Sequence, residues 1–307
     1  MSLLVPDSKR TADTVARIED KDIETARNTE KDDMLNLIRS RFESGSSTLS
    51  LLKELYPDNI VYVNRSGNYV FADINPKLAA SEYDKSAFAR NDKGLMTYSG
   101  TNAETYTGID LSKHNSDVDF AKVKAAGVDF AMIRCGYRAY GSGLLVEDTS
   151  FNTYTTNAIK NNIDVGVYFY SQALNKEEAI EEANYVLTLV KPYNITYPIA
   201  IDVEAIENDS FRQENLSASE LTDVIIAFCD TIKAAGYTPL IYSNLLYFMD
   251  NVELERLEGY DKWFAGYQTA SPYYPYKYAM WQYTSTGSIN GVSGNIDINI
   301  AMKKLKK

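Results

Sequence analysis

The chain has 307 residues, of which 45% are hydrophobic and 24% charged, a composition typical of a folded globular protein. Its formal net charge of −11 argues against a nucleic-acid partner, since phosphate binding requires a basic surface. With one histidine and two cysteines, the chain can form neither a histidine-rich or four-cysteine zinc site nor a disulfide scaffold.

The beginning of the chain is polar and charged, without the pattern of a signal peptide. We expect residues 1–48 to form a helical stalk or a partly disordered lead, ending in the hinge-like sequence Ser-Gly-Ser-Ser. Residues 49–105 are predicted to form a small α+β module. It would contain a short helix that stops at Pro57 and a β-hairpin that turns at Ser66-Gly67-Asn68.

From residue 106 onward, short apolar runs alternate with segments of helical period. The apolar runs predict eight strands, at 106–111, 128–135, 163–170, 197–204, 237–243, 262–267, 277–283 and 295–300. Helices are expected between the first five of these strands, at 117–126, 149–161, 176–190 and 217–235.

This alternation predicts an α/β fold with a parallel sheet covered by helices. Eight strands within residues 106–307 fit a closed barrel better than an open sheet. That length is at the lower limit for a full (β/α)8 barrel, so the helices after the fifth strand should be short or missing.

Carboxylates stand at or near the ends of several apolar runs, where such barrels carry their chemistry. Asp110, Asp202, Glu204 and Asp297 come from three of the predicted runs and are expected to meet at one mouth. Asp202 and Glu204 are two apart on a strand, so their side chains share a face, with backbones about 6–7 Å apart. Two carboxylates that close leave one as an acid and one as a base, as glycoside hydrolysis requires.

Further polar and aromatic residues at these strand ends are expected to face the same mouth: Arg134, Tyr168, Tyr170, Tyr242, Trp263, Trp281 and Gln282. Two other interpretations of the acids remain open from the residues alone. They could be ordinary surface acids at strand ends, or their oxygens could hold calcium or magnesium.

The series GIDLSKHNSDVDFAKVKAAGVDFAMIRCGYR, VGVYFYS, YPIAIDVE, GYTPLIYSN, WFAGY and MWQYTSTGSINGVSGNIDIN resembles glycoside hydrolase family 25, the muramidases of bacteria and phages. The match covers residues 106–307 in order. It implies a TIM-like (β/α)5(β)3 barrel that needs no cofactor or metal. It also implies cleavage of the β-1,4 bond between N-acetylmuramic acid and N-acetylglucosamine in peptidoglycan.

The resemblance also implies a role for each matched residue. Glu204 corresponds to the general acid/base, and Asp202 to the residue that supports the 2-acetamido group as internal nucleophile, with net retention. Asp110 and Asp297 would hold the network and keep Glu204 protonated. Four aromatic residues fall where family members line the sugar subsites: Tyr168, Tyr170, Tyr242 and Trp281.

Two rival functions remain, one from another class and one that is also an enzyme. One is a non-catalytic wall-binding protein on an inactive barrel, and the other is a chitinase-like N-acetylglucosaminidase. For the muramidase we expect peptidoglycan glycan strands as partner and an extracellular or cell-surface location. The region before residue 106 is similar to that of membrane-anchored family members, which leaves open an anchor upstream of the sequence.

Overall fold

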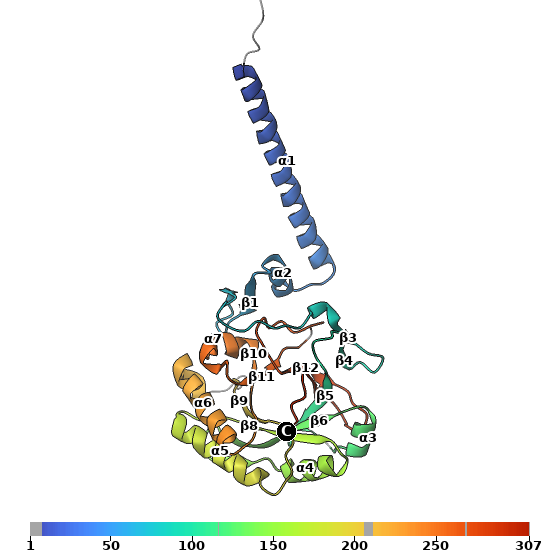
Figure 1. Cartoon of the computed structure of the whole chain (residues 1–307), viewed down its shortest axis with the longest axis vertical. Coiled ribbons are helices and arrows are strands. Elements are labelled where there is room, and N and C mark those ends of the chain that lie inside the picture. The colour runs from blue at the N-terminus through green and yellow to red at the C-terminus, as the bar shows by residue number, and fades with distance from the viewer. Residues whose placement is uncertain (1–7, 116, 206–210, 268, 307) are drawn as a thin grey trace, which may run out of the picture. The chain divides into compact units, whose positions relative to one another are not determined.

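A computed structural model describes residues 8–115, 117–205, 211–267 and 269–306 (Figure 1). The chain forms two compact units that divide between Asp73 and Ile74. Among the described residues, no helix combines the length and the apolar character that a membrane span requires.

The first unit contains a long helix, a short helix and a β-hairpin. Its elements are α1 (Ser8–Glu43), α2 (Thr48–Leu55), β1 (Asn59–Val63) and β2 (Tyr69–Asp73). Ser47 caps α2 by accepting a hydrogen bond from the Ser50 backbone N–H, and an Arg41–Glu54 ion pair of 2.7 Å links the two helices. The hairpin turns at Gly67, whose φ of +79° is a backbone conformation that favours glycine.

Eight strands of the second unit close into a barrel, because β5 pairs with both β6 and β13. The strands are β5 (Tyr106–Leu111), β6 (Phe130–Arg138), β8 (Asp164–Tyr170), β9 (Ile199–Asp202), β10 (Pro239–Asn244), β11 (Asp261–Ala265), β12 (Met280–Gly287) and β13 (Ile296–Ala301). A short strand, β7 (Leu145–Glu147), pairs with the end of β6 outside this ring.

The α-helices of this unit are α3 (Phe120–Ala125), α4 (Phe151–Lys160), α5 (Lys176–Val190), α6 (Ala218–Ala234) and α7 (Leu245–Asp250). Figure 1 shows α3 to α6 around the outside of the strands. Short 3-10 turns occur at η1 (Lys85–Ala87), η2 (Arg212–Asn215) and η3 (Leu254–Leu257). Ser217 and Glu220 form a complete capping box at the start of α6.

The expectation of an all-parallel sheet is wrong for the last strand. β13 runs antiparallel to both of its neighbours, β12 and β5, whereas the other pairs in the ring are parallel. A parallel partner needs a long crossover connection, and the segment 288–295 between β12 and β13 is too short to provide one.

Residues 74–105, which we expected to belong to a separate module, lie in the same compact unit as the barrel. This segment contains a second hairpin, β3 (Phe88–Arg90) and β4 (Met96–Tyr98). The backbone N–H of Met96 donates to the Tyr283 hydroxyl at 3.2 Å, and Phe88 packs edge-on against Trp281. The described residues between β11 and β13 form no α-helix. Residues 74–105 pack against strand β12 in place of a helix.

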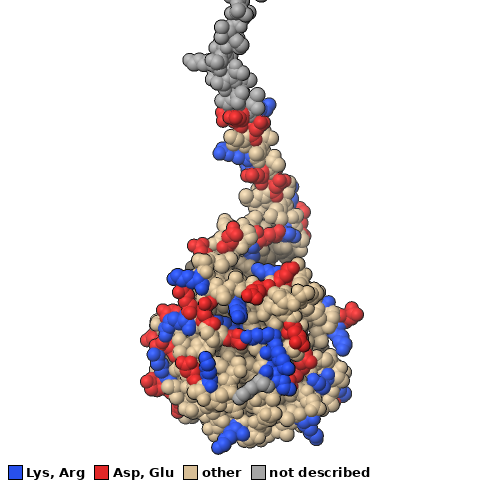
Figure 2. All heavy atoms as spheres, viewed as in Figure 1, with Lys and Arg blue, Asp and Glu red and all other residues tan. Residues whose placement is uncertain are grey.

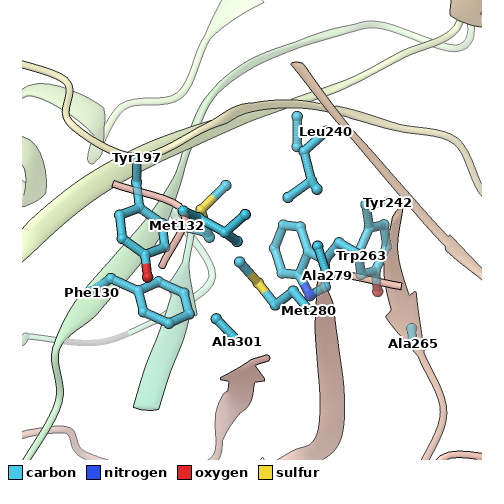
Figure 3. Close-up of a cluster of buried hydrophobic side chains, with 12 residues drawn as sticks. Phe130, Met132, Tyr197, Leu240, Tyr242, Trp263, Ala265, Ala279, Met280 and Ala301 are labelled. Atoms are coloured by element: carbon cyan, nitrogen blue, oxygen red, sulfur yellow. The ribbon is translucent and has the colours of Figure 1, made fainter. Parts of the chain in front are cut away.

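Side chains that point into the barrel form its apolar core (Figure 3). The core residues are Phe130, Met132, Tyr197, Ala200, Leu240, Tyr242, Trp263, Ala265, Ala279, Met280, Ala301 and Leu305. Phe130 stacks on Tyr197 with ring centroids 4.4 Å apart, and Trp263 meets Tyr242 edge-on at 4.6 Å. This core forms the base on which the polar residues at the mouth are held.

Candidate active site

A cavity of about 190 Å³ lies at the carboxyl ends of the parallel strands. It is lined by Asp110, Tyr168, Asp202, Glu204, Tyr242, Trp263, Tyr267, Gln282 and Asp297. The four predicted carboxylates therefore share one pocket. Asp297 reaches it from the beginning of its strand, because antiparallel β13 places Asp297 directly opposite Asp110.

Asp110 and Asp297 form a hydrogen-bonded pair of carboxyl groups. Burial, and then the charge of Asp297, raises the pKa of Asp110 well above its usual range. Burial raises the pKa of Asp297 to about 6. Ionising both carboxyl groups of a hydrogen-bonded pair would place two negative charges side by side, which costs free energy. The pair therefore shares one proton near neutral pH.

Two side-chain amides fix the orientation of Asp110. Its Oδ2 accepts hydrogen bonds from Gln282 Nε2 at 2.9 Å and from Asn299 Nδ2 at 2.8 Å. Asn299 in turn accepts a bond from Trp263 Nε1 at 2.8 Å. With Oδ2 occupied by two donors, the other oxygen of Asp110 is the one available to Asp297.

Two tyrosine hydroxyls complete this network from the pocket wall. Tyr242 and Tyr267 both donate to Gln282 Oε1, at 2.8 and 2.6 Å. Tyr267 was not among the predicted site residues, although the apolar run 262–267 ends at this residue, two residues past the end of β11. Asn299 was also missed, although its position two residues after Asp297 on one strand puts it on the same face.

Asp202 differs from Asp110 in having an oxygen without a partner. The residue is 4% exposed, and its Oδ1 is buried without a hydrogen-bond partner among the described residues. Burial, and then the charge of Glu204, raises the pKa of Asp202 well above its usual range. Glu204 lies two residues beyond it, just past the end of β9, and is half-buried at the pocket.

The predicted sugar-binding residues divide into two groups. Tyr168, Tyr242, Trp263 and Gln282 line the pocket, although Trp263 is 1% exposed and therefore supports the pocket from below. Tyr170 and Arg134 do not line it. The Tyr170 hydroxyl lies 3.5 Å from the backbone oxygen of Glu204, which places it behind the acid.

Arg134 lies beside the acids, where its charge lowers the pKa of Asp202 against the larger effect of burial. Its Nε donates to Asp148 at 2.7 Å, and its Nη2 is buried without a hydrogen-bond partner among the described residues. A free donor on Arg134 and a free acceptor on Asp202 thus occur next to the same pocket. Buried polar atoms of this kind gain from a polar group of a bound ligand.

Trp281 is placed outside the pocket, which corrects its prediction as a sugar-binding residue. It is fully buried on the outer side of β12, where its Nε1 donates to the Gly266 oxygen at 2.8 Å and its ring meets Phe88. Neighbouring residues of a strand point to opposite faces, so Trp281 and the inward-pointing Gln282 cannot both line the barrel mouth.

The pocket offers proton transfer and hydrogen bonding. Among the described parts of the chain, no group of three or more His, Cys, Asp or Glu side chains is arranged to hold a metal ion. Both cysteines, Cys135 and Cys229, are buried and unpaired. Several acids that share protons, next to a half-buried carboxyl group, are the arrangement that acid–base catalysis on a glycosidic bond requires.

The sequence profile of glycosyl hydrolases family 25 matches residues 109–292, which include Asp110, Asp202 and Glu204. The chain belongs to this family. The barrel is similar to that of a family 25 glycosyl hydrolase from Bacillus anthracis, with a TM-score of 0.54 and 21% identity, covering 66% of this chain and 91% of that one. At that identity the likeness concerns the fold.

Two curated relatives of this family 25 chain are lysozymes. It is 25% identical to the autolytic lysozyme of Clostridium acetobutylicum, over 62% of this chain and 54% of that protein. It is 26% identical to lysozyme M1 of Streptomyces globisporus, over 62% of this chain and 66% of that protein. The chain thus spans between about half and two thirds of the length of these relatives.

A solved structure, that of the modular autolysin LytC from Streptococcus pneumoniae in complex with a synthetic peptidoglycan ligand, is also similar. The TM-score is 0.56 and the identity 25%, over 78% of this chain and 56% of that one.

Proposed function

We propose that this chain is an N-acetylmuramidase that cleaves the β-1,4 bond between N-acetylmuramic acid and N-acetylglucosamine in peptidoglycan. The observation that carries the proposal is the single pocket in which Asp110, Asp202, Glu204 and Asp297 meet. Membership of family 25 and the likeness to two lysozymes and to a peptidoglycan-binding autolysin support the choice of substrate.

Glu204 is the general acid in this proposal. Glu204 and Asp297 are half-buried, whereas Asp110 and Asp202 are 5% and 4% exposed. Because Asp297 is hydrogen-bonded to Asp110, Glu204 is the carboxyl group that a glycosidic oxygen can reach. Glu204 donates its proton to the leaving glycosidic oxygen and then, as carboxylate, takes a proton from the incoming water.

Asp202 supports the substrate's 2-acetamido group. Its buried Oδ1 lacks a partner among the described residues, and the acetamide N–H supplies the missing donor. The acetamide oxygen then attacks the anomeric carbon, and the Asp202 carboxylate stabilises the positive charge that develops on the oxazolinium ring. Water opens this ring, which gives net retention of configuration.

Asp110 and Asp297 share one proton. Gln282 and Asn299 hold Asp110 in place by donating hydrogen bonds to it. The negative charge that remains on this pair favours the protonated form of Glu204. Tyr168, Tyr242 and Tyr267 provide the aromatic walls against which sugar rings pack. The charge of Arg134 lowers the pKa of Asp202 and so favours the carboxylate form of that residue.

We further assign the barrel to the (β/α)5(β)3 arrangement, with residues 74–105 in place of the outer helices. An extracellular or cell-wall location, with or without an anchor upstream of the sequence, follows from the proposed substrate.

The test is digestion of purified peptidoglycan by the wild type and by Glu204→Gln, followed by mass spectrometry of borohydride-reduced fragments. We expect reduced muramic acid ends with the wild type and none with the variant. Reduced glucosamine ends would instead indicate a glucosaminidase. If neither protein produces new ends, the chain is a wall-binding protein and the proposal fails.

Proton NMR of freshly formed product tests the acetamido route separately. Retention predicts that the β-anomer appears first. An initial α-anomer would mean inversion and would exclude neighbouring-group participation, without affecting the assignment of the cleaved bond.

A further inference from the structure

A second cavity, of about 390 Å³, lies in the barrel unit far from the acids. It opens beside the amino ends of β10 and β11, whereas Glu204 follows the carboxyl end of β9. The cavity is about twice the size of the acid pocket and falls within the usual range for small-ligand sites. Its lining includes Lys233, Lys262, Lys277, Tyr260, Tyr274 and Tyr276.

Lys262 is the most unusual of these residues, since it is a lysine that is only 7% exposed. It lies on β11 next to the inward-pointing Trp263, so its own side chain points out of the barrel. Its Nζ donates to the Leu257 oxygen at 2.6 Å, and no carboxylate among the described residues forms an ion pair with it. A buried ammonium group without a directly bonded carboxylate is costly to the fold, and burial lowers the pKa of Lys262 to about 8.

Glu258 and Asp261 also line the cavity, and their charges raise the pKa of Lys262, although neither forms an ion pair with it. Glu258 accepts a hydrogen bond from the Ala79 backbone N–H at 2.6 Å, and Asp261 forms an ion pair of 2.8 Å with Lys303. The exposed side chains of Lys233 and Lys277, at the rim, have no ion-pair partner among the described residues. Three ammonium groups and two carboxylates thus border one cavity, in a protein whose net charge is −11 and whose visible face carries acidic and basic side chains interspersed (Figure 2).

Tyrosine rings form much of the remaining wall. Tyr274 is fixed by stacking on Phe264 at 4.9 Å, and the Tyr276 hydroxyl accepts a bond from the Asn75 backbone N–H. Tyr260 donates to Asp230 at 2.7 Å. Rings held in this way offer rigid surfaces to the C–H groups of a sugar or polyol, while the lysines attract a multiply charged anion.

We propose that this cavity is a second ligand site, which binds the phosphate ester of a polyol or sugar. Lys262 contacts the phosphate at the bottom of the cavity, Lys233 and Lys277 bind it at the rim, and the tyrosines pack against the carbon skeleton. The site is independent of glycan cleavage, because it lies at the opposite end of the strands from Glu204.

The test is titration of the whole chain with sn-glycerol 3-phosphate, followed by calorimetry and by backbone amide shifts. We expect saturable binding at millimolar or lower concentration, with shifts at residues 258–262 and 274–277 and none at 202–204. The double variant Lys233→Gln/Lys277→Gln should weaken binding about tenfold or more. Lys262→Met should weaken it as well.

The matched control is Lys160→Gln/Lys191→Gln, which removes two exposed lysines elsewhere on the barrel unit. This control and Glu204→Gln should both bind as the wild type does. Equal weakening in the control would show a non-specific effect of net charge and overturn the proposal. Absence of saturation in the wild type at about 10 mM ligand would overturn it too.

If the variants bind weakly, a urea titration shows whether they are folded. Inorganic phosphate alone and unphosphorylated glycerol serve as part-ligands, and each should bind more weakly than the ester. Glycerol binding as tightly as the ester would remove the anionic component of the proposal and contradict it.

Discussion

Two sets of buried carboxylates in the barrel unit have opposite surroundings. In the pocket, Asp110 and Asp202 form no ion pair with a lysine or arginine among the described residues, and the pKa of each is raised well above its usual range, chiefly by burial. Near the ends of β6 and β8, burial also raises the pKa of fully buried Glu182, to about 7, but this acid forms a 2.8 Å ion pair with buried Arg138, which acts against that rise. Its neighbour Glu178 pairs with Arg212, also at 2.8 Å.

The difference separates acids whose charge is balanced by a cation from acids that take part in the chemistry under the proposed function. Removing one partner of a buried ion pair lowers the stability of the protein, because the other partner is left as an isolated buried charge. A buried acid without one costs stability and is the kind of residue found in active sites. Replacing members of each set should therefore change stability in opposite directions.

The largest loss of stability is expected when the arginine that pairs with buried Glu182 is removed. Arg138→Met should lower the free energy of unfolding by about 3–5 kcal/mol, because it leaves Glu182 buried without its cation. Urea denaturation at neutral pH measures this value. The control is Arg256→Met, which also removes an arginine paired with two carboxylates but one whose side chain is 39% exposed, and it should cost about 0–1 kcal/mol. Equal costs for the two variants would contradict the distinction.

Asp202→Asn is expected to separate activity from stability. The wall-lytic rate should fall about 10²–10³-fold, because the charge opposite the developing positive centre is lost. The free energy of unfolding should stay equal or rise, since a buried, unpaired oxygen loses its charge. Wall-turbidity assays and urea denaturation provide the two measurements.

Asp148→Asn is the control for this variant. Asp148 is as buried as Asp202, but it accepts bonds from Arg134 Nε and from the Lys113 and Ser150 backbone N–H groups. Its loss should destabilise the protein by about 1–3 kcal/mol. A similar loss of stability in both variants would show that Asp202 is a structural residue.

The Asp110–Asp297 pair should be visible in the pH dependence of stability. Burial raises the pKa of Asp297 to about 6 from an ordinary value of 3.8, so the native state binds more protons than the unfolded state in that interval. The contribution of such a group falls as pH rises from about 4 through 6. Asp297→Asn, which stays neutral, should reduce this fall by about 1–3 kcal/mol between pH 4 and pH 8.

Urea denaturation of both proteins at several pH values tests this expectation. Parallel pH profiles for the wild type and Asp297→Asn would show that Asp297 titrates normally in the native state.

The smallest effect is expected at the edge of the pocket network. Tyr267→Phe removes one of two hydroxyls that donate to Gln282 and should cost about 0.5–1.5 kcal/mol in transition-state stabilisation, with little change in unfolding. The ratio kcat/KM on a defined glycan fragment measures it. Tyr140→Phe, at a tyrosine of similar exposure, should leave the ratio unchanged.

Much of the barrel could be predicted from the sequence because buried parallel strands are short and almost wholly apolar. Each of the eight apolar runs overlaps one strand of the ring, and the four expected helices match α3, α4, α5 and α6. The runs do not indicate strand direction, however. Asp297 reaches the pocket only because β13 is reversed, which the apolar pattern could not reveal.

The errors at the site have identifiable physical causes. Alternation along a strand excludes Trp281 once Gln282 points inward, and it would have included Asn299 with Asp297. Tyr267 ends the apolar run 262–267, so its place at a predicted strand end was a signal that we did not use. The packing of residues 74–105 on the barrel rests on contacts between distant parts of the chain, such as Met96 with Tyr283, and no local pattern predicts these.

The hairpin segment 74–105 has a consequence for modular exchange between wall enzymes. We expect recombination that joins this barrel to another leading region to preserve the barrel unit when the crossover falls before residue 74. A crossover at 105 would remove the cover of Trp281 and the Tyr283 hydroxyl's backbone donor, leaving aromatic surface open to aggregation. The unit that can be exchanged as a whole therefore begins earlier in the chain than the match to family 25, which starts at residue 109.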